Sequence, residues 1–131
     1  MLQVKHIKEF SFGINQREGK FFNNGFPLSS DEQKSLIKNN IVIGYQGKHF
    51  TLRSWASQQS KGLTVHNLPG ETIEHKRQLL WQSVKQDKVD RWLIDLANQV
   101  KQHEVTLYYL SSQHDKPVAE LIQRFIAWYN K

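Results

Sequence analysis

Apolar side chains along the last third of the chain follow the order helix, strand, helix. Residues 89–100 place apolar side chains at helical spacing, and residues 118–129 do so again. Between them, residues 105–110 read VTLYYL, an almost continuous run of β-branched, aromatic and aliphatic side chains. A strand of this kind between two amphipathic helices is typical of a sheet that is covered by helices.

The first half of the chain carries mainly strand patterns. Apolar and polar residues alternate over 2–12 with one phase break, and residues 20–22 predict a strand that returns beside it. Residues 41–45 and 49–52 predict a hairpin around a turn at 46–48, and residues 63–66 predict one more strand.

Two helix starts are marked by polar residues. Ser29 with Glu32, or Ser30 with Gln33, has the spacing of a capping box, so a short helix begins here and ends at the asparagines 39 and 40. Thr72 predicts the start of a second helix, which extends to about residue 86 with residues 73, 80, 81 and 84 on its inward side.

Together these elements predict an α+β fold, or a mixed-sheet α/β domain. The N-terminal half is rich in strands and has one short helix, and the C-terminal helix-helix-strand-helix unit packs on the same sheet. The 131 residues are expected to form a single domain, 1–131, because this length suits one hydrophobic core.

Composition narrows the classes of function. The chain has no cysteine, which excludes disulfides, thiolate metal sites and a cysteine nucleophile. The first residues hold no apolar run that would suit a signal peptide, and no stretch approaches the roughly 20 apolar residues that span a bilayer. We therefore expect a cytoplasmic protein that has no membrane partner.

The charge of the chain suggests a first hypothesis for its function. The formal net charge is +6, and the first 60 residues hold eight Lys/Arg against four Asp/Glu. Basic residues Lys5, Lys8, Arg17 and Lys20 alternate there with several phenylalanines, a combination that single-stranded nucleic acid uses through phosphate pairing and stacking. The first hypothesis is a small, basic, non-catalytic protein that contacts nucleic acid or a nucleic-acid-associated protein.

A second hypothesis uses two loops that each follow a predicted strand and precede a predicted helix. If the two strands are parallel neighbours, loops 66–71 and 111–116 lie at the carboxyl edge of the sheet, where open α/β sheets bind ligands. The loops carry His66, Asn67, Ser111, His114 and Asp115, which would suit a small enzyme or a nucleotide- or phosphate-binding domain. The competing interpretation is an ordinary exposed loop in which Asp115 caps the last helix.

A third hypothesis concerns the apolar face of the last helix. Ile126 and Trp128 fall partly outside the stripe of apolar residues that runs from 118 to 129. A wide apolar face on a terminal helix can pack against a second chain. We therefore expect these two residues at an interface in a homodimer or in a protein-interaction module of the inhibitor or immunity type.

The remaining motifs give no catalytic or cofactor assignment. Residues 49–52, HFTL, match one H-x-T-x element of the two-histidine phosphoesterases, but that family needs two copies and the chain has one. The six histidines lack the spacing of metal ligands, so we predict neither a metal nor a cofactor. Residues 75–128 are loosely similar to the tail of small rhodanese-like domains, but the early arginine- and tryptophan-bearing motif of such domains does not occur in this chain.

Overall fold

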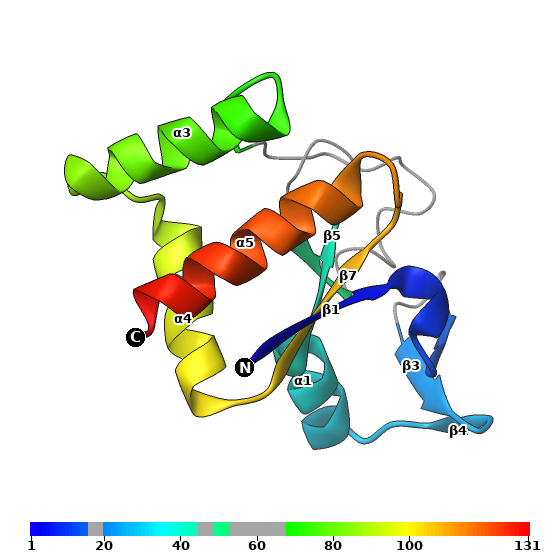
Figure 1. Ribbon diagram of the computed structural model, residues 1–131. Coiled ribbons are helices and arrows are strands. Elements are labelled where there is room, and N and C mark those ends of the chain that lie inside the picture. The colour runs from blue at the N-terminus through cyan, green and yellow to red at the C-terminus, as the bar shows by residue number, and fades with distance from the viewer. Residues whose placement is uncertain (16–19, 45–48, 53–67) are drawn as a thin grey trace.

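The structure is a computed structural model that describes residues 1–15, 20–44, 49–52 and 68–131 (Figure 1). The strands are β1 (Leu2–His6), β2 (Gly13–Asn15), β3 (Lys20–Asn23), β4 (Phe26–Pro27), β5 (Asn40–Ile43), β6 (His49–Thr51) and β7 (Val105–Tyr109). The helices are α1 (Ser30–Asn39), α3 (Ile73–Lys85), α4 (Arg91–Gln102) and α5 (Asp115–Tyr129), with a 3₁₀ turn η1 (Ile7–Glu9). The strand predicted at 63–66 lies outside the described residues.

The strands form a mixed four-stranded sheet and a small antiparallel one. The order in the larger sheet is β1-β7-β5-β6; β7 is parallel to both β1 and β5, and β6 is antiparallel to β5. β2, β3 and β4 form the small sheet. The predicted α+β class is confirmed, and so is the hairpin that β5 and β6 form.

The larger sheet is covered on both faces, and β7 shows how its sequence allows this. Val105 and Leu107 are fully buried against α4 and α5, whereas Tyr108 belongs to a second core cluster on the opposite face with Phe21 and Leu36. Alternate residues of a strand point to opposite faces, so a strand that is buried on both sides is apolar almost throughout. Figure 1 accordingly shows α3, α4 and α5 on one side of the strands and the small sheet on the other.

Helix starts follow the sequence closely. Ser29 is the N-cap of α1 and forms the predicted capping box with Glu32, in which the Glu32 N–H donates to Ser29 Oγ at 3.2 Å. Thr72 caps α3 in the same way, its Oγ1 accepting from the His75 N–H at 3.1 Å. These side chains satisfy amide groups that a first helical turn leaves without intrahelical partners.

The end predicted for the first helix is confirmed, because α1 ends at Asn39 and Asn40 begins β5. Two other local predictions are wrong. Residues 2–12 are not one strand, because His6 and Glu9 form a capping box that turns the chain into η1. Ile73, the first residue of α3, is 42% exposed and does not belong to the core.

Candidate functional site

The predicted nucleic-acid residues lie in the N-terminal elements, but the phenylalanines beside them are packed inward. Lys5 on β1, Lys8 on η1 and Lys20 at the start of β3 are exposed, and Arg17 lies outside the described residues. Phe21 is fully buried, and its neighbours Phe10, Phe12 and Phe50 pack against the same cluster. Rings that form a core offer no free face to a base. Most of the phenylalanines that were expected to stack on bases are therefore not accessible.

Phe26 is the exception in this region. It is 76% exposed at the start of β4, directly after Asn24 and Gly25, whose positive φ angles of 52° and 83° form the tight turn between β3 and β4. It is a single exposed ring on a hairpin, and scattered apolar residues of this kind are common on protein surfaces.

The predicted ligand loop 111–116 is closed by hydrogen bonds among its own residues. The Ser111 N–H donates to Asp115 Oδ2 at 2.9 Å, and Ser111 Oγ accepts from the His114 N–H at 3.2 Å. The Asp115 and Lys116 N–H groups both donate to the Ser111 carbonyl. The polar groups of this loop therefore bind one another and fix the start of α5.

Asp115 is the first residue of α5 rather than its N-cap, and it is buried. Asp115 is 1% exposed, and its Oδ1 atom has no hydrogen-bond partner among the described residues. Burial raises the pKa of this carboxyl, while the Ser111 N–H and the nearby His114 oppose the shift. A carboxylate that is sealed in this way supports the loop and does not reach a ligand in solution.

The other predicted loop, 66–71, is described only from Leu68 onward, so His66 and Asn67 lie outside the described residues. Leu68 is buried in the core, and its carbonyl accepts from Lys76 Nζ at 2.6 Å. Gly70 has a φ of 116°, and a Cβ there would lie 2.7 Å from the backbone nitrogen of Lys76. The loop thus lies against the first turn of α3 at a position that only glycine fits.

The most conspicuous exposed feature is an aromatic cluster where α3 and α5 lie side by side. We call it the aromatic surface, and its members are Trp81, Phe125, Trp128 and Tyr129. The Trp81 and Trp128 rings meet edge to face, with centroids 4.5 Å apart and an interplanar angle of 83°. Phe125 is fully buried beneath them, while Trp128 is 42% and Tyr129 is 37% exposed.

The two residues of α5 that were predicted at an interface differ in their exposure. Trp128 is exposed as expected, but Ile126 is 1% exposed and belongs to the core beneath α5. This correction follows from helix geometry, because residues two apart on a helix point in different directions. Trp81, which the sequence placed on the inward side of α3, takes the place of Ile126 beside Trp128.

Basic residues occupy the helical positions next to the two tryptophans. Residues three or four positions apart are neighbours on a helix. For the two tryptophans these positions hold Arg77, Lys85, Arg124 and Lys131 and no Asp or Glu. Within the described part of the chain, Lys85 and Arg124 have no ion-pair partner.

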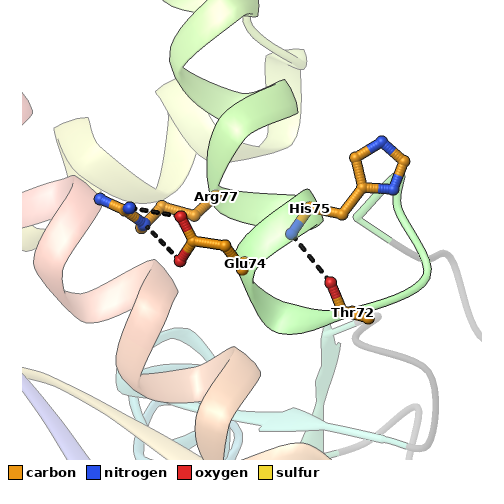
Figure 2. Close-up of polar contacts among 4 residues, drawn as sticks. All are labelled: Thr72, Glu74, His75 and Arg77. Atoms are coloured by element: carbon orange, nitrogen blue, oxygen red, sulfur yellow. Dashed lines mark hydrogen bonds and ion pairs between the residues drawn. The ribbon is translucent and has the colours of Figure 1, made fainter.

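A groove of about 400 Å³ lies toward the starts of the same two helices. It is lined by Ile73, Glu74 and Arg77 of α3 and by Pro117, Glu120, Leu121 and Arg124 of α5. Figure 2 shows Glu74 and Arg77 on the side of α3 that faces α5, joined by a bidentate ion pair, and His75 on the other side. The hydrogen bond with Arg77 lowers the pKa of Glu74, and the same bond raises the pKa of Arg77.

Other classes of site find no support in the described residues. Across the four described segments, no group of three or more His, Asp or Glu side chains is placed to hold a metal ion. None of the helices in these segments is both long and apolar enough to cross a membrane.

Comparison with known proteins finds no protein family, no curated protein and no solved structure that matches this chain.

Proposed function

We propose that this chain is a protein-interaction module that binds an acidic amphipathic helix along the seam between α3 and α5. The observation that carries the proposal is the Trp81–Trp128 pair, in which Trp128 is 42% exposed and Trp81 is partly buried, with basic residues at the neighbouring helical positions. Tryptophan, tyrosine and arginine are the residue types that most often dominate binding energy at protein interfaces. A cytoplasmic setting belongs to the same proposal, because a chain without cysteine needs no oxidising compartment to fold.

The aromatic surface is ordered before any partner arrives. Each tryptophan contacts the other and Phe125, which lies in the core. Side chains that are already held in place lose little conformational entropy on binding, so more of their contact energy appears as affinity. This favours a specific protein contact.

The seam has the dimensions and polarity that suit a short helix. It runs from Pro117 to Trp128, and at 1.5 Å per residue this is about 17 Å, or three turns of a partner helix. Apolar residues on one face of the partner would lie on Leu121, Ile73 and the tryptophans, as in other helix-in-groove complexes. Acidic residues of the partner would meet Arg124 and Lys85 near the tryptophans, whereas Glu74 and Glu120 line the groove toward the helix starts and would face its uncharged or basic residues.

Nucleic acid is the competing partner, since it also uses aromatic and basic residues. Bases stack on flat ring faces and need no groove. The aliphatic side chains of Ile73 and Leu121, which line the groove beside the tryptophans, suit the aliphatic side chains of a peptide better. The groove lining therefore favours a protein partner, and binding of nucleic acid is the alternative outcome of the test.

The test is fluorescence anisotropy with labelled peptides of about 14 residues, roughly four helical turns. One peptide places Leu on one helical face and Glu on the other, a second replaces Glu by Lys, and a third scrambles the first. We expect the acidic amphipathic peptide to bind best and Trp128→Ala to abolish its binding. The triple variant Lys5→Gln, Lys8→Gln, Lys20→Gln serves as the matched control and should bind normally.

The same assay includes a single-stranded oligonucleotide. If the oligonucleotide binds at low salt, loses affinity in the triple variant and leaves the acidic peptide unbound, the protein-partner proposal is overturned in favour of nucleic acid. Equal binding of the acidic and scrambled peptides would also overturn it, because the seam would then not recognise an amphipathic helix.

A further inference from the structure

A second groove lies on the other flank of α5, away from α3. It has a volume of about 610 Å³ and lies between the start of β1, the end of α4 and the last turns of α5, with Met1 and Asn130 among its lining residues. This volume is within the range of roughly 300–1,000 Å³ that is usual for small-molecule sites. We infer that this groove binds a small molecule with an aliphatic chain and a single carboxylate, such as a medium-chain fatty acid.

The aliphatic part of the ligand follows from the side chains in the groove. Leu2, Val100, Ile126 and Ala127 line it, and the part of the chain that the structure describes places no aromatic ring in its lining. The first three are core residues whose outer atoms form part of the groove wall. An aliphatic wall contacts a flexible hydrocarbon chain well, whereas a planar heterocycle or base would find no ring on which to stack.

The carboxylate follows from the charges. Lys101, at the end of α4, and Arg124, on α5, line the groove, and none of its described lining residues is Asp or Glu. Both side chains are exposed, and neither has an ion-pair partner in the described part of the chain. Arginine and lysine bind carboxylates through charge-assisted hydrogen bonds, which are the strong ones in proteins.

The groove is also held open by hydrogen bonds that do not involve a ligand. Gln123 Nε2 donates to the Leu2 carbonyl at 2.8 Å, which fixes α5 against β1. Asn130 Nδ2 donates to the Ala97 carbonyl at 2.9 Å, which fixes the end of α5 against α4. A groove with walls fixed in this way is preformed, so a ligand does not have to order it.

The inference is independent of the proposed function, because the groove does not include the aromatic surface. Only Arg124 lines both grooves. Trp128→Ala should therefore abolish peptide binding and leave binding in this groove intact, so the two proposals can fail separately.

The experiment is isothermal titration and thermal unfolding with sodium decanoate below its micellar concentration. Decanol and decyltrimethylammonium serve as neutral and cationic ligands with the same chain. We expect decanoate alone to raise Tm clearly, and we expect Arg124→Gln or Lys101→Gln to weaken its binding about tenfold, the loss of one charge-assisted hydrogen bond. Lys88→Gln, an exposed charge outside the groove, should bind decanoate normally.

A second pair of variants tests the place of binding without touching the core. Ala127 is exposed on α5, so Ala127→Trp should fill the groove and abolish decanoate binding while the protein stays folded. Asn98→Trp puts the same side chain on an exposed position of α4 outside the groove lining and should have no effect. Absence of a decanoate response, equal responses to all three ligands, or full binding by Ala127→Trp would each overturn the inference.

Discussion

Two regions of the molecule combine aromatic and basic residues in the sequence, and the fold uses them in opposite ways. In the N-terminal region, Phe21 is fully buried and Phe10 and Phe12 pack against it, so the lysines there surround a core. Along α3 and α5, Trp128 and Tyr129 remain more than a third exposed, and the basic residues surround a surface. Aromatic and basic residues in one segment therefore do not identify a binding site until the exposed rings are known.

The physical difference between the regions is the number of layers that cover the rings. The phenylalanines lie between the four-stranded sheet and the small sheet, which cover them from both sides. The tryptophans lie at the outer edge of a helix pair, with the core beneath them and no further element outside them in the described residues.

The largest effect that we expect is on stability in the N-terminal region. Phe21→Ala should lower the free energy of unfolding by about 3–5 kcal/mol, because it removes a fully buried ring and leaves a cavity. Urea unfolding measures this. Phe26→Ala, at a ring that is 76% exposed, is the control and should change stability by no more than about 0.5 kcal/mol. Similar losses in both variants would contradict the contrast between buried and exposed rings.

Trp128→Ala should have its main effect on binding. We expect binding of the acidic peptide to fall below detection, well beyond the about tenfold loss that marks an interface hot spot. The loss of stability should stay below the about 3–5 kcal/mol of a fully buried tryptophan, because the side chain is 42% exposed. Phe26→Ala again provides the control in the anisotropy assay, and an equal loss of affinity there would mean that any exposed ring serves.

Asp115→Asn tests the contrast between the first turn of α5, where Asp115 is buried, and its last turn, where Trp128 is exposed. A carboxyl whose pKa is raised by folding binds protons more tightly when folded, so the contribution of Asp115 to stability should rise as the pH falls toward the ordinary Asp pKa of about 3.9. The asparagine variant lacks this contribution. Urea unfolding at about pH 7 and about pH 4 should show the wild-type protein gaining relative to the variant; a constant difference would contradict a raised pKa.

The smallest effects should come from the basic residues. Lys85→Gln and Arg124→Gln together should change stability by no more than about 0.5 kcal/mol, because both side chains are exposed and unpaired within the described residues. The same double variant should weaken acidic-peptide binding and make it less dependent on salt. Lys5→Gln with Lys8→Gln should leave the salt dependence of peptide binding unchanged. A change in this control would mean that the N-terminal lysines take part in binding.

Much of the fold could be predicted because its signals are local. Ser29 with Glu32 and Thr72 mark helix starts through side chains that bond amides within the same turn, and the VTLYYL run identifies β7 by its almost continuous β-branched, aromatic and aliphatic side chains. The break at His6 was missed because a histidine at an N-cap is an uncommon choice, although Glu9 three residues later was the available signal.

The candidate site could be predicted only in part, because it joins elements that are far apart in the sequence. Trp128 was expected at a surface from its position on one helix, but its contact with Trp81 depends on how α3 and α5 pack. Ile126 was predicted at the surface because the sequence does not show which of two adjacent apolar stripes on α5 packs against the sheet and is buried. Asp115 was expected as a cap, and only the packed structure shows it buried.

The sequence by itself determined the class of fold, the helix starts, the central strand and the basic character of the chain. These depend on hydrophobic periodicity, on short-range hydrogen bonds and on composition, all of which act within a few residues. The tertiary structure alone decided which aromatic rings are covered and which are exposed, and it brought Trp81 to Trp128 and Leu2 to Gln123. That decision depends on contacts between distant segments, because a side chain is buried only when another element packs over it.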